Sequence, residues 1–410
     1  MKLSTRLSFV PMALAAAAFL FVVAGPAEKA FAFQAKAGKA DAKADAKGDA
    51  KAKGKGKGAG AARIKTTVVA SGLNHPWSMA WLPNGDILVT ERVGKVRLIH
   101  DGVLDPEPLA GVPAVHAVRL SGLMEVLPHP NFAQNQFVYL TYTKDTNVAK
   151  GEVSTTLARG RLVGKALVDV KDLLVCDPWL GDGGSGSRLA WGRDGMLFMT
   201  TGASNGNAAQ EPGSLRGKIL RLTDEGKAAP GNPFIGKAGY KPEIYTMGHR
   251  NSLGLALNPA TGDFWSNENG PAGGDEVNVL KPGANYGWPE VSFGRTYEGQ
   301  RIVYVKEGTV PPVIFWAPSI APSGMLFYTG DRFPSWKGNL FVGAQLGGTV
   351  PGSPHLERIT LDANQDETSR ESLLLDLKVR VRDIRQGPDG LVYVVTDEDN
   401  GQVIRIEPAQ

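Results

Sequence analysis

The sequence predicts an all-β chain folded as a six-bladed β-propeller of four-stranded antiparallel blades. A paired motif of turn, strand, turn and strand recurs along the chain, most clearly at 83–90 with 94–99 and at 388–396 with 401–406. Short apolar runs lie between Gly, Pro, Asn and Asp turns, which favours strands, and beyond the amino-terminal region no helical period competes with them. Weaker copies complete a set of six, whose inner strands are predicted to begin near residues 87, 137, 196, 263, 340 and 391.

The spacing of these copies suits blades with long loops, because successive starts lie 50 to 77 residues apart. A ring of blades protects its strand edges by radial closure and gathers its loops around one mouth of a central channel. A β-sandwich is the alternative, but its strands are not expected to recur as this paired motif.

The amino-terminal residues 1–32 have the layout of a secretory signal peptide. Lys2 and Arg6 precede an apolar stretch at 7–24, and small residues follow at 30–32. We therefore expect an exported protein, periplasmic or secreted. The apolar stretch is also near the lower limit of about 17–25 residues for a membrane span, so an uncleaved anchor at 7–24 is the alternative. No later segment is long enough to span.

Residues 33–62 predict a disordered tether, and residues 63–410 the propeller. The tether holds eight lysines and three aspartates among Ala and Gly, with no hydrophobic period. The tether contributes +5 and residues 1–32 contribute +2 to the chain's formal charge of +4, so residues 63–410 are slightly acidic at about −3. This charge argues against a propeller that binds nucleic acid. The single cysteine, Cys176, excludes an intrachain disulfide.

Four motifs between residues 247 and 289 carry a family resemblance. They are Gly-His-Arg-Asn at 248–251, Asn-Glu-Asn-Gly-Pro at 267–271, Gly-Asp-Glu-Val-Asn at 274–278 and Gly-Ala-Asn-Tyr-Gly-Trp-Pro at 283–289. This ordered block resembles the signature of the soluble glucose and sorbosone dehydrogenases. Segments at 73–77, 90–92, 122–132 and 380–384 extend the resemblance over residues 66–407. It implies a six-bladed propeller that uses pyrroloquinoline quinone (PQQ) and calcium to oxidise a sugar or polyol and passes electrons to a separate acceptor.

The resemblance places four residues at cofactor-contacting positions: Arg250, Asn251, Arg380 and Arg382. PQQ is a planar, multiply anionic quinone, and arginine presents a permanently charged fork that matches carboxylates. The alternative is that these arginines only pair with acidic loop residues.

The resemblance also implies two calcium sites. Gly270 and Pro271 match the segment whose carbonyls hold the ion that touches PQQ, and Glu276 and Tyr286 match a second, structural site. Asp275 is a further candidate. Calcium prefers six to eight oxygen ligands, including backbone carbonyls and carboxylates. The alternative is a solvated acidic loop.

The catalytic base of the family is missing. The family's histidine stands four residues before the arginine of a Gly-Arg-Leu segment, and counting back from Arg188 places Gly184 there. Imidazole is suited to take the anomeric hydroxyl proton near neutral pH, and glycine cannot do so. Leu120 and Leu346 stand where the family has a glutamine and a lysine at the cofactor. Asp182 and His116 are candidate substitutes for the base, although each is more simply read as an ordinary loop residue.

Three functions remain open from the sequence. The first is PQQ- and calcium-dependent oxidation of an aldose or related sugar alcohol, with weak or altered turnover that a Gly184→His substitution restores in part. The second is a non-catalytic, calcium-stabilised propeller that binds in the cell envelope. The third is a lactonase-like hydrolase in which calcium polarises a carbonyl and activates water. The retained arginines favour the first function over the third, and the losses at Gly184, Leu120 and Leu346 favour the second.

Overall fold

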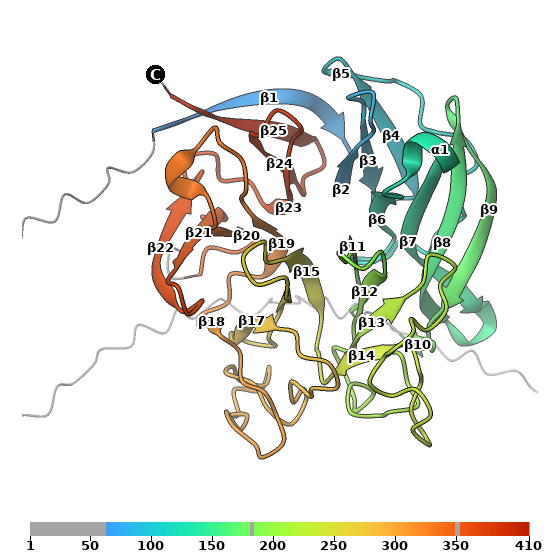
Figure 1. The fold of residues 1–410 in the computed structure, drawn as a ribbon, viewed down its shortest axis with the longest axis vertical. Helices are drawn as coiled ribbons and strands as arrows, with labels where there is room; N and C mark the ends of the chain where they lie inside the picture. The colour runs from blue at the N-terminus through green and yellow to red at the C-terminus, as the bar shows by residue number, and fades with distance from the viewer. Residues whose placement is uncertain (1–62, 181–183, 349–352, 410) are drawn as a thin grey trace, which may run out of the picture. The chain divides into compact units, whose positions relative to one another are not determined.

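The described part of the chain forms six antiparallel sheets arranged as the blades of a propeller (Figure 1). The structure is a computed structural model, and it describes residues 63–180, 184–348 and 353–409. The predicted signal peptide or anchor (1–32), the predicted tether (33–62) and Asp182 lie outside the described residues. Among the described residues, no helix is long and apolar enough to cross a membrane.

Each blade is a meander of consecutive strands, here given from the innermost strand outwards. Blade 1 is β2 (Pro76–Trp81), β3 (Ile87–Glu91), β4 (Lys95–His100) and β5 (Val103–Leu104), and blade 2 is β6 (Leu123–Pro128), β7 (Phe137–Asn147), β8 (Glu152–Val163) and β9 (Ala166–Val175). Blade 3 is β11 (Gly186–Trp191), β12 (Leu197–Thr201), β13 (Lys218–Leu222) and β14 (Ile244–Met247), and blade 4 is β15 (Ser252–Leu257), β16 (Phe264–Glu268), β17 (Asp275–Val279) and β18 (Ile314–Trp316). Blade 5 is β19 (Pro322–Phe327), β20 (Leu340–Ala344), β21 (Leu356–Leu361) and β22 (Glu367–Leu373), and blade 6 is β23 (Val381–Gln386), β24 (Val392–Thr396), β25 (Gly401–Pro408) and β1 (Ile64–Leu73).

Short elements complete the described chain. They are β10 (Trp179–Leu180), which pairs with β8 as a fifth strand of blade 2, the helix α1 (Phe132–Asn135), and the 3₁₀ turns Val148–Lys150 and Pro334–Trp336.

The sequence repeat gave the right number of blades but the wrong strand as the inner one. The strands predicted to be inner are β3, β7, β12, β16, β20 and β24, and each is second from the centre. The innermost strands precede them and contact one another around the channel. The turns that made the repeat visible connect the first strand to the second, so the motif marks the second and third strands of each blade.

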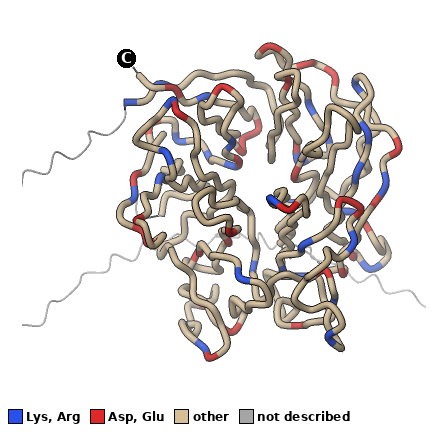
Figure 2. Tube along the Cα trace, viewed as in Figure 1, with Lys and Arg blue, Asp and Glu red and all other residues tan. Residues whose placement is uncertain are grey.

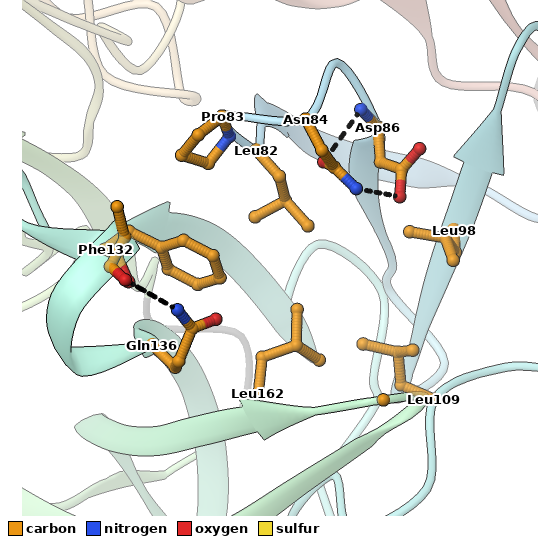
Figure 3. Close-up of a pocket in the computed structure, with 11 residues that line it drawn as sticks. Leu82, Pro83, Asn84, Asp86, Leu98, Leu109, Phe132, Gln136 and Leu162 are labelled. Carbon is orange, nitrogen blue, oxygen red and sulfur yellow. Dashed lines mark hydrogen bonds between the residues drawn. The ribbon is translucent and has the colours of Figure 1, made fainter.

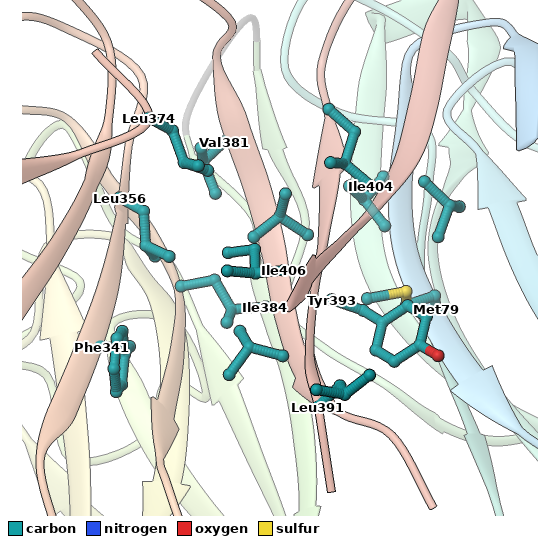
Figure 4. Close-up of a cluster of buried hydrophobic side chains, with 14 of the residues drawn as sticks. Met79, Phe341, Leu356, Leu374, Val381, Ile384, Leu391, Tyr393, Ile404 and Ile406 are labelled. Atoms are coloured by element: carbon teal, nitrogen blue, oxygen red, sulfur yellow. The ribbon is translucent and has the colours of Figure 1, made fainter. Parts of the chain in front are cut away.

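Blade 6 joins the two ends of the described chain. Strand β1 pairs antiparallel with β25, so that Ile64 lies opposite Pro408 and Leu73 opposite Gly401. The ring is therefore closed by hydrogen bonds between an amino-terminal and a carboxy-terminal strand, which removes two free strand edges. The largest apolar cluster lies here, between blade 6 and its neighbours, and includes Val381, Ile384 and Ile404 (Figure 4).

A buried ionic network joins the innermost strands around the channel. Arg188 of β11 contacts Glu125 of β6 at 3.1 Å and Asp383 of β23 at 2.9 Å, and it donates through Nε to the Leu253 carbonyl of β15 at 2.9 Å. Arg385 of β23 contacts the same two carboxylates at 2.6 and 2.9 Å. Two guanidinium groups thus balance two carboxylates, and four blades are tied together at the axis.

Candidate functional site

The predicted site residues lie on one rim of the ring, which we call the mouth. The mouth is the rim where the innermost strands begin and the second strands end. Hydrogen bonds connect neighbouring blades there: Leu123 N–H donates to the Arg92 carbonyl at 3.0 Å, and Ala203 N–H to the Arg250 carbonyl at 2.7 Å. Gly184, Arg250, Asn251 and Arg380 each lie just before an innermost strand, while Gly270 follows a second strand.

Arg250 is held at the mouth by neutral groups. Its Nη1 donates to the Asn269 carbonyl at 2.9 Å, its Nη2 donates to the Tyr297 hydroxyl at 3.0 Å, and its guanidinium lies 5.2 Å from the centre of the Trp288 ring. Its buried Nε has no hydrogen-bond partner among the described residues. Because these side-chain contacts place no carboxylate against the guanidinium, the predicted alternative of a simple ion pair with a loop acid does not describe Arg250.

Asn251 connects Arg250 to the Gly184 segment. Its Oδ1 accepts from Gly186 N–H at 3.0 Å, and its Nδ2 donates to Asn269 Oδ1 at 3.3 Å. Asn269 in turn donates to the Pro322 carbonyl at 2.9 Å. The loops of blades 3, 4 and 5 therefore meet around this asparagine pair.

Arg380 and Arg382 share two partners that the sequence did not reveal. The Oε1 of Gln345 accepts from Arg380 Nη2 at 2.9 Å and from Arg382 Nη2 at 2.8 Å, and Asp397 pairs with both arginines. Burial alone would raise the pKa of the Asp397 carboxyl, but Arg382 holds it below its ordinary value. The Arg382 side chain is 2% exposed and that of Arg380 40%, so Arg380 is the one that a ligand in the mouth can touch directly.

Three of the four predicted calcium residues, Gly270, Glu276 and Tyr286, line one small cavity, and Pro271 is not among its lining residues. Glu268 and Arg250 also line the cavity, and its volume of about 10 Å³ is roughly what one water molecule needs. Burial and repulsion from the nearby Glu268 carboxylate raise the pKa of Glu276 well above its ordinary value. A cation in the cavity would relieve that repulsion.

The other groups near the cavity have internal partners. Asp275, the additional candidate, accepts from Ser319 and from the N–H groups of Gly270, Ile320 and Ala321, so it fastens loops together. The Tyr286 hydroxyl donates to the Val279 carbonyl. Within the described ranges no group of three or more His, Cys, Asp or Glu side chains is arranged to hold a metal. A calcium ion here would depend on backbone carbonyls as much as on Glu276.

Gly184 has a conformation that resists a side chain. Its φ is +68°, and a Cβ built there would lie 2.2 Å from Ser204 Oγ and 3.1 Å from Asn251 Oδ1. The Ser204 hydroxyl therefore occupies the place where a histidine side chain would begin. This adds a steric reason for the partial rescue that the sequence predicts for Gly184→His.

The remaining predicted positions are exposed at or near the mouth. Leu120 and Leu346 are 51% and 52% exposed. His116 lies beside blade 2, with its Nδ1 2.8 Å from Asp145 Oδ1. Five residues that contact the predicted ones were not predicted as site residues: Asn269, Tyr297, Gln345, Asp397 and Ser204. Two of them lie beside a sequence signal, since Asn269 is inside the 267–271 motif and Gln345 precedes Leu346. No local sequence feature marks the other three.

Two surface features lie outside the mouth. An apolar pocket of about 340 Å³ lies between blades 1 and 2 near the turn that joins β2 to β3, which places it toward the opposite rim (Figure 3). It is lined by Leu82, Leu98, Leu109, Phe132 and Leu162, and it contains no predicted site residue.

Acidic and basic positions are interspersed around the ring (Figure 2).

Comparisons with known proteins agree with this architecture. A family model described as Glucose / Sorbosone dehydrogenase matches residues 73–405. The aldose sugar dehydrogenase YliI of Escherichia coli is 38% identical over 357 residues, covering 85% of this chain and 94% of the relative. The quinoprotein glucose dehydrogenase B of Acinetobacter calcoaceticus is 27% identical over 427 residues, covering 82% and 87%. The PQQ-bound aldose sugar dehydrogenase of Streptomyces coelicolor superposes with a TM-score of 0.68 at 27% identity, covering 85% and 99%. The chain therefore belongs to the glucose/sorbosone dehydrogenase family.

Proposed function

We propose that this protein is a PQQ- and calcium-dependent oxidoreductase that oxidises an aldose or related sugar alcohol, with turnover limited by the glycine at position 184. Membership of the family makes the chain a sugar dehydrogenase-type oxidoreductase. The use of PQQ is supported by the quinoprotein relative and by the relative solved with PQQ bound. Calcium, the missing base and the choice of substrate belong to the proposal.

The observation that carries the proposal is a set of unpaired donors at the mouth. Arg250 Nε, Arg380 Nε and Gln345 Nε2 are buried nitrogens without a hydrogen-bond partner among the described residues. Leaving a buried donor unpaired costs about 1–3 kcal/mol, so such groups usually have a purpose. Donors on two arginines and a glutamine fit a ligand with several carboxylates, as PQQ has.

Each residue then has a defined task. Arg250, Asn251 and Arg380 bind and orient the anionic cofactor, while Gln345, Asp397 and Arg382 hold Arg380 in place. The carbonyls of Gly270 and Pro271, with Glu276, hold calcium. When bound, PQQ supplies a quinone that accepts hydride from the sugar carbon. Gly184 offers no side chain to take the hydroxyl proton, so proton transfer is the slow step.

Titration of the purified protein with PQQ in calcium, followed by absorbance, tests the proposal. Arg250→Gln removes a charged donor worth about 1.5–3 kcal/mol, which weakens PQQ binding roughly 10- to 150-fold. Arg161→Gln is the matched control, because Arg161 pairs with Asp169 on the outside of blade 2. Failure of the wild-type protein to bind PQQ would overturn the proposal and support the non-catalytic envelope-binding propeller instead.

We further propose that the protein works outside the cytoplasm, in the periplasm or beyond, and that residues 1–32 direct its export. The support is the order of charged, apolar and small residues in that segment. The electron acceptor would then be a component of the same compartment.

A further inference from the structure

We infer that His116, oriented by Asp145, is the proton acceptor that takes over from the missing residue at position 184. This inference rests on the proposed function and names the group that allows residual turnover. It is carried by the position of His116 at the mouth, by the face on which Asp145 lies, and by the contacts of the imidazole.

His116 continues the innermost strand of blade 2 by one rung. Its N–H donates to the Thr143 carbonyl at 2.7 Å, and the Thr143 hydroxyl donates back to the His116 carbonyl at 2.6 Å. Thr143 N–H also donates to the Gly122 carbonyl, just before β6. The His116 backbone is thereby fixed against the end of β7, at the mouth.

Asp145 lies on the face of blade 2 that looks toward the Gly184 segment. Side chains two residues apart on a strand share one face, so Thr141, Thr143 and Asp145 of β7 point the same way. The Thr141 hydroxyl donates to the Ser187 carbonyl at 2.7 Å. Thr155 of β8, the register partner of Thr143, donates to the Ser185 carbonyl at 3.2 Å. This face therefore packs on residues 185–187, directly beside Gly184.

The contact with Asp145 leaves the second imidazole nitrogen available. His116 Nδ1 lies 2.8 Å from Asp145 Oδ1, an ion-pair distance. Among the described residues no contact of Nε2 with an acidic side chain occurs, so Nε2 is the nitrogen that we assign to accept the proton. The side chains of His116 and Asp145 are 35% and 45% exposed, so a sugar in the mouth can reach the pair.

The proton balance of the step is simple. The hydroxyl proton of the sugar passes to His116 Nε2, the hydrogen on the same carbon leaves with its electron pair to the quinone cofactor, and a carbonyl forms in the sugar. Asp145 stabilises the imidazolium that results.

Two cationic residues stand near the pair in the sequence. Lys144, next to Asp145, is bonded to Asp172 at 2.6 Å, and Arg119 lies three residues after His116. Residues 184–187 of blade 3 bring no titratable side chain to the pair. Of the charged side chains in the described ranges, Asp145 is the one recorded in contact with the imidazole.

The test compares His116→Gln and Asp145→Asn with a control at the opposite rim. His100→Gln is that control, because His100 also pairs with an aspartate, Asp86, but at the far end of blade 1. PQQ binding is measured first by absorbance and is expected to be unchanged in all three variants. Reduction of the bound quinone by an aldose is then followed from pH 5 to 9.

The wild-type rate is expected to rise with pH, because the imidazole must be unprotonated to accept the proton of the sugar hydroxyl. His116→Gln should flatten that profile and lower the rate at pH 8 by about 100-fold or more, while His100→Gln leaves both unchanged. A readout that needs no turnover is the NMR chemical shift of the His116 imidazole, which Asp145→Asn should change because it removes the charged group that lies 2.8 Å from Nδ1.

Three results would overturn the inference. They are bound PQQ that no sugar reduces, a rate and pH profile that His116→Gln leaves as they are, and an NMR chemical shift of the His116 imidazole that Asp145→Asn does not change. Failure to bind PQQ at all overturns the proposed function as well, so the two failures are distinguishable.

Discussion

Replacing Gly184 by histidine tests whether this position limits turnover, and the structure shows that the single substitution is not enough. A residue with a side chain at a φ of +68° costs roughly 1–2 kcal/mol. The new Cβ would also lie 2.2 Å from Ser204 Oγ, well inside contact distance. We therefore expect Gly184→His to be destabilised by more than about 1–2 kcal/mol and to gain little activity.

Combining Gly184→His with Ser204→Ala removes the clashing oxygen and leaves mainly the backbone cost. A positioned general base contributes on the order of 10²–10⁴-fold. In a His116→Gln background, which lacks the substitute base, the double variant should therefore reduce bound quinone faster by a factor within that range. The lower end is expected, because Leu120 and Leu346 still offer no hydrogen bond at the mouth.

The assay is dye-coupled sugar oxidation after reconstitution with PQQ and calcium, with thermal unfolding measured on the same preparations. Ser204→Ala alone is the control, and it should change neither rate nor stability by much. The reasoning is refuted if Gly184→His alone is as stable and as active as the double variant, or if neither variant exceeds the wild type while PQQ still binds.

Four further predictions follow from the same contacts. Calcium at a hundredfold excess over its dissociation constant should stabilise the fold by about 2.7 kcal/mol in thermal unfolding. Glu276→Gln should abolish this response to calcium. The same variant should make the calcium-free protein more stable, because it removes the repulsion between the carboxylates of Glu276 and Glu268. Burial disfavours the imidazolium of His355, but its hydrogen bonds to Glu357 and the Ser353 carbonyl outweigh this and raise its pKa. The stability that this pair contributes is therefore present below pH about 6.5 and is lost as the pH rises through the raised pKa. In the variant His355→Gln, the melting temperature should depend less on pH between pH 6 and 9. Glu125→Gln should cost about 3–5 kcal/mol in denaturant unfolding, because it leaves the Arg188 and Arg385 cations with one carboxylate between them. Mass spectrometry of cell fractions should find the mature chain in the envelope without residues 1–32, whereas an intact amino terminus on cytoplasmic protein would contradict export.

The repeat was sufficient to predict the blades because turn residues and short apolar runs are local features. It assigned the wrong strand to the centre because innermost strands such as β2 and β6 have no turn motif of their own. Their identity depends on contacts between blades, including the Arg188 network, which join residues far apart in the sequence.

The site residues also fall into two groups, those that local sequence motifs identify and those whose importance depends on tertiary packing. Motifs identified Arg250, Asn251 and Arg380, which the structure places at the mouth, and each of the two arginines has a buried Nε without a partner among the described residues. Asp397 and Ser204 could not be predicted, because their importance comes from what tertiary packing puts beside them. The contact of His116 with Asp145, on which the proposed role of His116 rests, is likewise a tertiary feature that the local sequence does not reveal.

Rapid mixing of the calcium- and PQQ-loaded wild-type protein with an aldose tests the central claim most directly, because the spectrum of the bound quinone separates binding from proton transfer. The account predicts that PQQ binds, that its reduction is slower than in the Gly184→His, Ser204→Ala variant, and that His116→Gln slows it by a further factor of about 100 or more. Rapid reduction in the wild type, unaffected by His116→Gln and not exceeded by the double variant, would contradict it.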